Sequence, residues 1–388
     1  MIRRPPRSTL SSSSAASDVY KRQVKPCAIC FKSRNNIVQN EQEVSYMAFK
    51  VIVCRDFDHM SEVANSIALG NIKKTLAEKG TFVLGLATGN SPTGLYKHLA
   101  KSANAGEFDS SRVKSFNLDE YIGLPGENAQ QRALHPESYS YFMIQEFFSL
   151  LQKKFIETNV PWGTLIEQEQ LITELKNNPD DWEEQGTEKG KAIVIKKDAG
   201  SVYLRWVRKE TVDAYVEKID NAGGIDLHII GVGGRGHVAF HESGIPFEGN
   251  KMLLVKLDDN TVANAVEDGH FSTKQDSPWY ALSMGAQQVY KARTVLLLAN
   301  GPRKSSPVAE SLLNDPTPDV PISYSQLYAK NGGNMVYVID KAAAKDILAN
   351  IAKIENKGIE IEDISDQSCD VKVEDLKFFR YPDTGLMG

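Results

Sequence analysis

The chain has 388 residues, with 45 Lys and Arg against 50 Asp and Glu, and 41% of its residues are hydrophobic. This composition is typical of a globular protein with one large α/β domain or about two to three average ones. The net charge of -5 argues against a nucleic-acid or anionic-membrane surface as the main function. No apolar run approaches the roughly 20 residues that span a bilayer. Four cysteines do not make a disulfide framework, which favours a reducing, cytoplasmic location.

The first 46 residues are predicted to lie outside the folded domain. Residues 1–23 combine Arg and Pro with a Ser run, without the apolar core of a signal peptide. They resemble translated sequencing-adapter sequence, and a Ser- and Arg-rich transit peptide is the alternative. We expect residues 24–46 to be upstream sequence read in frame and Met47 to be the true start. Cys27 and Cys30 form a lone CxxC here, to which we assign no function.

From residue 49 onward, apolar runs alternate with helical patterns. Strands are predicted where short apolar runs end at turn residues, and helices where apolar positions recur every three to four residues. In chain order we expect strand 49–54, helix 61–80, strand 81–87, helix 95–106, strand 113–121, helix 135–152, a polar insertion over about 160–200, helix 209–224, and strands 225–233, 252–257, 294–299 and 334–340. This alternation predicts an α/β fold with one doubly wound, mainly parallel sheet, flanked by helices and Rossmann-like. We expect residues 47–388 to form a single domain.

Three strand ends carry unusual chemistry, and ligands of such sheets bind beyond the carboxyl ends of the strands. The first strand end is followed by Thr88, Gly89, Asn90 and Ser91. Glycine lets backbone N–H groups approach an anion, hydroxyls add donors, and the next helix N-terminus favours negative charge. No Lys-Ser/Thr pair follows, so this is not a Walker A loop. The segment predicts a monophosphate-binding loop, and an ordinary capped turn is the alternative.

The second strand end carries two adjacent carboxylates, Asp119 and Glu120. They point to opposite faces if the strand continues. One of them can then enter a cleft as a general base while its neighbour is structural. A solvated acidic turn is the alternative.

The third strand end is a glycine-rich segment, 231–236, followed by His237 and Glu242. Its GxGxxG spacing is also found in dinucleotide-binding sites, with Asp258 as the candidate acidic residue. The glycines and the proline that follow, however, leave no room for the long helix whose N-terminus would bind the pyrophosphate. We expect instead that the glycines present His237 as an acid/base and that Glu242 holds its tautomer. A structural histidine is the alternative. We predict no metal and no cofactor, because His241 has no second ligand at useful spacing.

Four segments occur together in the order and spacing of a known family: GLATGNSPTGLYKHL, SFNLDEYIGLP with HPESYSYFM, IDLHIIGVGGRGHVAFHE, and YALSMGAQQVYKARTVLLLANGPRK. They resemble the glucosamine-6-phosphate deaminase (isomerase) family, which shares its fold with 6-phosphogluconolactonases. The resemblance runs from about residue 49 to the C-terminus and leaves out only the 160–200 insertion. FNLDEY followed by HPESY is specific to the deaminase side.

The resemblance implies metal-free conversion of an aminohexose 6-phosphate to a ketohexose 6-phosphate and ammonia, in amino sugar catabolism. Asp119 matches the proton-shuttling carboxylate, His237 the ring-opening acid/base, and Glu242 the carboxylate that orients the histidine. Glu120 is included in the predicted catalytic set. The phosphate-binding residues are matched by Thr88, Gly89, Asn90, Ser91 and Lys304. The implied partner is a small aminohexose phosphate, with no nucleic acid and no membrane, and a homo-oligomer is a state to test because family members are often oligomeric.

Two departures from the family pattern matter. Arg235 stands where the family has an acid that assists His237, and Val266 stands where it has a phosphate-contacting arginine. One hypothesis is that Arg235 supplies the missing positive charge to the substrate's phosphate or another anionic group. Well-studied deaminases carry polar and basic effector-site residues at four positions where this chain has apolar ones: Ile245, Pro246, Met252 and Leu254. We therefore predict no activation by N-acetylglucosamine 6-phosphate.

Two other functions are left open by the sequence. A lactonase-type hydrolase would keep His237 and the phosphate loop but would not need Asp119 as a carbon base. A non-catalytic sugar-phosphate sensor is suggested by the changes at Arg235 and Val266. The retained acid–base residues argue against the sensor, because a protein that only binds needs none of them.

Overall fold

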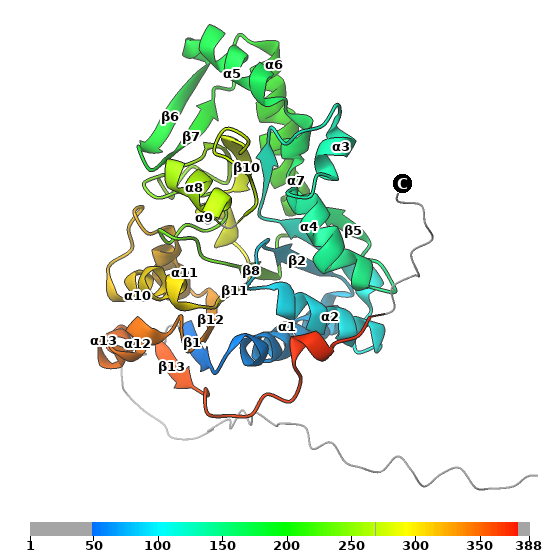
Figure 1. Ribbon diagram of the computed structural model, residues 1–388, viewed down its shortest axis with the longest axis vertical. Coiled ribbons are helices and arrows are strands. Elements are labelled where there is room, and N and C mark those ends of the chain that lie inside the picture. Colours follow the sequence, from blue (N-terminus) through cyan, green and yellow to red (C-terminus); the bar gives the residue numbers. More distant parts are fainter. Residues whose placement is uncertain (1–48, 268, 379–388) are drawn as a thin grey trace, which may run out of the picture. The chain divides into compact units, whose positions relative to one another are not determined.

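The computed structural model describes residues 49–267 and 269–378, so the predicted leader over 1–46 lies outside the described residues. The larger of two sheets contains β1 (Phe49–Cys54), β2 (Phe82–Leu86), β3 (Val113–Asn117), β5 (Glu157–Asn159), β8 (Leu227–Ile230), β11 (Thr294–Ala299), β12 (Asn334–Asp340) and β13 (Glu360–Asp363). Their spatial order is β13-β1-β12-β11-β8-β2-β3-β5, and all neighbouring pairs are parallel (Figure 1). The predicted α/β fold with a mainly parallel sheet is confirmed.

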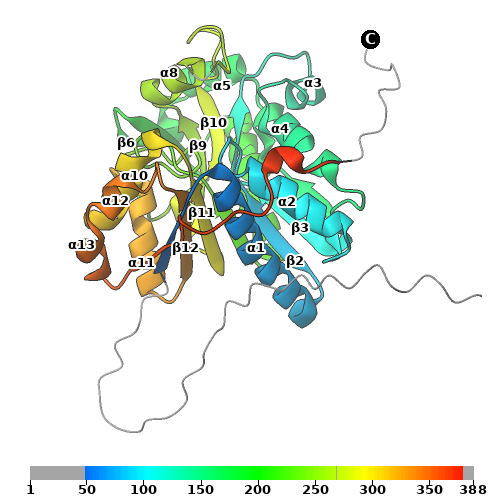
Figure 2. The same ribbon diagram turned by 60° about the horizontal axis from the view of Figure 1, so that its bottom comes forward.

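Both faces of the central strands of this sheet are buried, which explains why strands such as β2, β8 and β11 are continuous apolar runs. In β1, Ile52 and Cys54 pack into one apolar cluster, whereas Val51 and Val53 pack into another. The first cluster includes residues of three helices, α1 (Phe57–Lys79), α2 (Thr93–Asn104) and α4 (Tyr139–Glu146). Figure 2 shows α1 and α2 lying across the strands on that side.

The opposite face of the sheet is covered by further helices and by a second sheet. Its apolar cluster includes residues of α7 (Ala214–Asn221), α10 (Ser305–Leu313), α11 (Ser325–Lys330) and α12 (Lys345–Leu348). The remaining described helices are α3 (Ala129–Ala133), α5 (Gln168–Asn177), α6 (Val202–Trp206), α8 (Asp259–Glu267), α9 (Ala286–Val289) and α13 (Ile351–Glu355). No helix among the described residues is both long and apolar enough to cross a membrane.

The second sheet is antiparallel and was not predicted. It contains β4 (Asp119–Ile122), β6 (Trp182–Thr187), β7 (Gly190–Ile195), β9 (Met252–Lys256) and β10 (Tyr280–Met284), in the order β4-β10-β9-β7-β6. The expected strand 252–257 is therefore β9 of this sheet. The 160–200 insertion, which showed little pattern in the sequence, supplies α5 and the β6–β7 hairpin.

The strand expected over 113–121 is wrong in one respect, because the chain leaves the first sheet within it. Leu118 donates its N–H to the carbonyl oxygen of Leu86 on β2 at 3.0 Å, and its own carbonyl accepts the N–H of Met284 on β10 at 2.7 Å. The chain thus passes from β3 into β4 and from one sheet into the other. This junction places Asp119 at the point where the two sheets meet.

The helix expected over 135–152 is shorter in the structure. It begins only at Tyr139, because Ser138 is its N-cap and accepts the N–H of Ser140 at 3.1 Å. A 3-10 turn over Phe148–Leu150 follows it. The helix expected over 209–224 is the end of a longer helical segment, in which the π-helix Val207–Asp213 joins α6 to α7.

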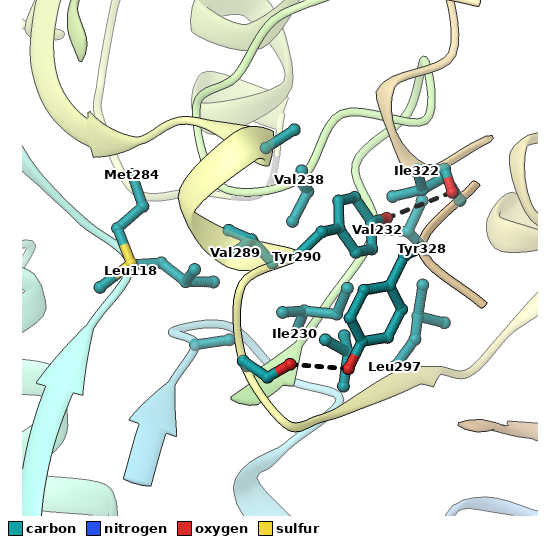
Figure 3. Packing of buried hydrophobic residues seen from close by; sticks show 14 of the residues in the cluster. Leu118, Ile230, Val232, Val238, Met284, Val289, Tyr290, Leu297, Ile322 and Tyr328 are labelled. Carbon is teal, nitrogen blue, oxygen red and sulfur yellow. Dashed lines mark hydrogen bonds between the residues drawn. The ribbon is translucent and has the colours of Figure 1, made fainter. Parts of the chain in front are cut away.

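The glycine-rich segment after β8 is anchored in the core rather than extending freely from the sheet. Val232, near its start, and Val238, just after its end, are buried together with Ile230 and Leu297 of the parallel sheet (Figure 3). Nearby, the Tyr290 hydroxyl donates to the carbonyl oxygen of Ile322 at 3.2 Å. These contacts limit how far the segment between Val232 and Val238 can move.

Candidate active site

Four neighbouring strands of the parallel sheet direct their carboxyl ends toward the predicted functional residues. In the order β11-β8-β2-β3, the chain continues from β2 to β3 on one side and from β8 to β11 on the other. The boundary between β2 and β8 is therefore a topological switch point, where ligands of open α/β sheets bind. Every predicted site residue lies in the segments that follow these strands: Thr88, Gly89, Asn90 and Ser91 after β2, Asp119 and Glu120 after β3, Arg235, His237 and Glu242 after β8, and Lys304 after β11.

The loop after β2 presents polar groups at a helix N-terminus. Gly89 has a φ of +118°, and Gly89 and Asn90 are exposed. The N-cap residue of α2, Pro92, makes no side-chain capping hydrogen bond. The Thr93 N–H, the first of α2, donates to the Asn90 carbonyl oxygen at 3.3 Å, and the anion-binding loop stays a prediction.

Two contacts join the loops after β2, β8 and β11. The Ser91 hydroxyl donates to Asn300 Oδ1 at 2.6 Å, and Lys304 Nζ donates to the carbonyl oxygen of Val232 at 2.7 Å. The glycine before Lys304 is fixed as well, since the Gly301 N–H donates to both carboxylate oxygens of Asp340 at 3.0 Å. The predicted phosphate-binding residues on different strands therefore lie in connected loops.

Asp119 is the first residue of β4 and is only 5% exposed. Its burial, together with the adjacent carboxylate of Glu120, raises its pKa well above the usual range. Across the antiparallel pair it lies opposite Ser283 of β10. A buried carboxyl group of this kind is a stronger proton acceptor than an exposed one once it is ionised.

Glu120 faces different surroundings from Asp119. Its Oε2 accepts hydrogen bonds from the Ser138 hydroxyl at 2.8 Å and from the N–H and hydroxyl of Ser140 at 3.0 Å. Its Oε1 accepts the N–H groups of Tyr121 and Tyr139 at 3.0 Å. Burial raises the pKa of Glu120, and these hydrogen bonds oppose that effect. The geometry favours the structural role for this carboxylate, which holds the first turn of α4.

The segment after β8 folds back on itself around His237. The Gly233 N–H donates to the His237 carbonyl oxygen at 3.0 Å, and Gly236 has a φ of +74°. A Cβ at Gly233 would lie 1.7 Å from His237 Nε2, so only glycine fits beneath the imidazole. His237 Nδ1 lies 3.1 Å from Glu242 Oε2, and Glu242 is buried. A carboxylate only accepts, so Nδ1 is the donor and Nε2 is left as the acceptor.

The histidine segment is also joined to the strand that opposes Asp119. The Phe240 N–H donates to Ser283 Oγ at 2.9 Å. The Phe240 ring lies 5.3 Å from that of Tyr121 and 5.9 Å from that of Tyr139. Ser283 thus lies opposite Asp119 in the second sheet and contacts the backbone of the segment that carries His237 and Glu242. Sequence reasoning missed it, although it lies inside the quoted segment YALSMGA.

The residue at the first departure from the family pattern makes an ion pair. Arg235 Nε lies 3.3 Å from Asp258 Oδ2, and the arginine side chain is 41% exposed. The Asp258 N–H donates to Glu242 Oε1 at 3.4 Å. Asp258 therefore contacts both Arg235 and Glu242, a role that the sequence did not reveal. Val266, on α8, is partly buried against an apolar cluster.

The alternatives of a dinucleotide site and a metal site find no support in this segment. The loop 231–250 contains no helix, so no N-terminus follows the glycines. His241 is buried and uses both ring nitrogens: Nδ1 accepts the Ala286 N–H and Nε2 contacts the carbonyl oxygen of Ile245, each at 3.0 Å. Burial lowers the pKa of His241 to about 4. Within the described residues, no group of three or more His, Cys, Asp or Glu could hold a metal ion.

A solved structure of similar fold gives the class of this protein. A monomeric glucosamine-6-phosphate deaminase matches with a TM-score of 0.56 and 25% identity, over 76% of this chain and 99% of that chain. No family model matches the sequence. The fold, with the predicted site residues at the switch point, is that of a deaminase-like enzyme.

Curated relatives make the assignment more specific. The glucosamine-6-phosphate deaminase of Clostridium acetobutylicum is 33% identical over 296 residues, which cover 76% of this chain and 99% of the relative. That of Thermoanaerobacter pseudethanolicus is 34% identical over 295 residues, covering 76% of this chain and 94% of the relative. The chain belongs to the glucosamine-6-phosphate deaminase family, as the quoted segments implied.

Proposed function

We propose that this protein converts glucosamine 6-phosphate and water to fructose 6-phosphate and ammonia. The observation that supports the proposal is the position of Ser283, which lies opposite the buried Asp119 in the second sheet and accepts a backbone N–H from the segment bearing His237 and Glu242. This combination supplies a base for a carbon-bound proton and an acid–base for ring opening.

Ring opening is assigned to His237. With Nδ1–H donated to Glu242, Nε2 is the nitrogen that accepts the proton of the anomeric hydroxyl. The same nitrogen returns the proton to the ring oxygen as the C1–O5 bond breaks. The product is the open-chain amino aldehyde, and the histidine ends in its starting state.

The carbon chemistry is assigned to Asp119. The carboxylate removes the C2 proton while a proton of the substrate's C2 ammonium group passes to O1, which leaves an enolamine between C1 and C2. The protonated carboxyl group then delivers its proton to C1. The resulting C2 iminium adds water and loses ammonia, which leaves the ketose phosphate. The raised pKa of Asp119 suits this task, because a stronger proton acceptor has a larger driving force for taking a carbon-bound proton.

Binding of the phosphate is assigned to the loop after β2 and to the residues around Lys304. Thr88 offers a hydroxyl donor, and the Ser91 hydroxyl would turn from Asn300 Oδ1 to donate to the phosphate. Gly89 and Asn90 expose backbone, and Lys304 supplies a positive charge. Glu120 is proposed to act indirectly, by holding α4 and the chain beside Asp119. Sugar phosphates are cytoplasmic metabolites, so a cytoplasmic location stays our prediction, which cell fractionation would test.

The experiment follows ammonia and ketose phosphate together after mixing the full chain with glucosamine 6-phosphate or galactosamine 6-phosphate. We expect equal amounts of both products and a loss of kcat of at least about 100-fold in Asp119→Asn. Asp198→Asn, at an exposed position, is the matched control.

Other outcomes would identify a different function. Hydrolysis of 6-phosphogluconolactone that is insensitive to Asp119→Asn, without ammonia from either sugar, would establish the lactonase alternative. A rise in Tm with sugar phosphates but no turnover of any of them would establish the sensor.

A further inference from the structure

The β6–β7 hairpin belongs to the 160–200 insertion, the segment that the family resemblance leaves out. Thr187 and Gly190 pair at its tip, and β7 pairs with β9 through Ala192 and Val255. The hairpin extends the second sheet as its edge, as the top of Figure 1 shows. Its tip reaches the chain segment that carries Glu242.

The tip of the hairpin contacts the Glu242 side chain directly. A Cβ at Gly190 would lie 2.4 Å from Glu242 Cβ and 2.7 Å from its Cγ. Gly190 is buried and has a φ of +130°. Glycine is required here both by the backbone conformation and by the space, so the hairpin backbone itself forms one wall against Glu242.

A second contact places the tip against the residues that follow Glu242. A Cβ at Gly244 would lie 2.5 Å from Thr187 Oγ1, so these two residues are in close contact. On its other side the segment is bonded to a neighbouring loop: the Gly244 N–H donates to the Pro318 carbonyl oxygen at 2.8 Å and the Ser243 hydroxyl to the Asp319 carbonyl oxygen at 2.7 Å. Residues 242–244 are thus held from both sides.

We propose that the β6–β7 hairpin is a positioning element for the acid–base pair. Gly190 limits where the Glu242 side chain can lie, and this keeps its carboxylate on His237 Nδ1 and the imidazole in the Nδ1–H tautomer. The predicted effect on kcat rests on the proposed function, whereas the predicted effect on the position of the Glu242 side chain does not. Gly190 and Thr187 act through Glu242 and the residues that follow it, and they are therefore positioning residues.

The positional consequence is tested on the full chain without substrate. Two-bond ¹H–¹⁵N NMR spectra of the histidine side chains, assigned with His237→Gln, report which ring nitrogen carries the proton. We expect Nδ1–H at His237 in the parent chain and a shift toward Nε2–H in Gly190→Ala. Gly70→Ala is the matched control, because that helical glycine has open space around it. An unchanged tautomer in folded Gly190→Ala overturns the proposal.

The kinetic consequence is tested with glucosamine 6-phosphate. We expect Gly190→Ala to lower kcat about tenfold or more, with KM changed less than about threefold. In a Glu242→Gln background the same substitution should cost no further kcat, because both changes act on one contact. An equal loss of kcat in both backgrounds overturns the proposal. If the parent chain releases no ammonia, the proposed function fails, and the tautomer measurement still decides the positional proposal.

A folding control keeps the test decisive. Circular dichroism and Tm establish whether Gly190→Ala is folded. If it is not, Thr187→Ala takes its place, because it removes the side chain that Gly244 contacts without straining the backbone. We then expect the same tautomer shift to a smaller extent and about a threefold fall in kcat. No change in either quantity would be evidence against the hairpin's role.

Discussion

Asp119 and Glu120 show how two adjacent carboxyl groups acquire opposite tasks from their surroundings. Both are buried, but Glu120 accepts hydrogen bonds from three N–H groups and two hydroxyls. For Asp119, burial and the neighbouring Glu120 are the influences on its pKa, and both raise it. A carboxylate that many donors stabilise is held in place, whereas one that is costly to ionise reacts readily with protons.

This contrast leads to a prediction on stability. The pKa of Asp119 is raised in the folded protein, so the folded state binds more protons than the unfolded state above pH of about 4. Ionisation therefore lowers the free energy of unfolding as pH rises. Asp119→Asn removes this cost, and we expect its Tm to exceed that of the parent chain at pH 8 by more than at pH 5. Thermal unfolding at both pH values measures the difference.

The matched control at the neighbouring position should behave in the opposite way. Glu120→Gln places an amide NH₂ against N–H or hydroxyl donors, and we expect it to lower the free energy of unfolding by about 1–3 kcal/mol. Urea unfolding at pH 7 checks this value. Equal stability of Glu120→Gln and the parent chain would contradict the structural role of that carboxylate.

Arg235 is one of the two residues at which the sequence is predicted to depart from the family pattern. If it supplies positive charge to the substrate phosphate, Arg235→Ala should raise KM about tenfold. The substitution also removes a charged partner of Asp258, whose side chain is only 6% exposed, so Tm should fall as well. Arg55→Ala breaks an Arg–Asp pair whose side chains are 46% and 47% exposed, and it serves as the control for the loss of an exposed arginine. An unchanged KM for every sugar phosphate tested would leave Arg235 only its contact with Asp258.

At the scale of elements, the pairing of β2 with β8 lies directly below the switch point at their carboxyl ends. His228 of β8 is fully buried, and burial lowers its pKa to about 3, so it is neutral. Its ring lies over Gly85 of β2, where a Cβ would lie 2.1 Å from His228 Cδ2. A small residue on one strand accommodates a large one on the next, and the two strands remain within pairing distance.

We expect Gly85→Ala to separate these strands or displace the imidazole, at a cost of about 1–3 kcal/mol in the free energy of unfolding. Gly70→Ala, on an exposed turn of α1, should instead stabilise the protein by up to about 1 kcal/mol. Chemical unfolding of both variants provides the comparison. A neutral Gly85→Ala would mean that the sheet adapts to the extra methyl group.

The elements that the sequence predicts well are those whose pattern is local. Strands such as 294–299 are buried on both faces and appear as continuous apolar runs, so the parallel sheet could be predicted. The second sheet could not, because three of its four strand pairings join segments far apart in the chain. β6, which pairs locally with β7, has no buried position and contains a glycine. Nothing local marks Leu118 as the point where the chain changes sheets.

The candidate site shows the same difference between features with a local sequence pattern and features that depend on distant residues. The placement of Asp119, His237 and Lys304 at one edge of the sheet was predictable, because each stands just beyond an apolar strand and the carboxyl ends of parallel strands share an edge. Ser283 and Gly190 were not, because their importance comes from a backbone N–H and a side chain more than forty residues away. Residues that position a site leave a weaker mark on the sequence than residues that react.

At the scale of the whole molecule, β1 pairs only with strands that belong to the described residues. It has a parallel partner on each side, β12 and β13, so no strand edge is left at its start. The chain after β13 returns across α1, where the Asp370 N–H donates to Glu62 Oε2 at 3.1 Å and the Val373 N–H to Asp58 Oδ1 at 3.0 Å.

We therefore propose that the domain begins at Met47, and we predict that a chain starting there keeps the kcat and KM of the full chain. Its free energy of unfolding should differ by less than about 1 kcal/mol, because every partner of β1 in the parallel sheet lies after residue 48. Steady-state kinetics with glucosamine 6-phosphate and thermal unfolding of both chains make the comparison. A lower Tm or kcat in the shorter chain would show that residues 1–46 contribute to the folded enzyme. Comparing the loss of kcat caused by Asp119→Asn in both chains would then show whether that contribution acts at the candidate active site.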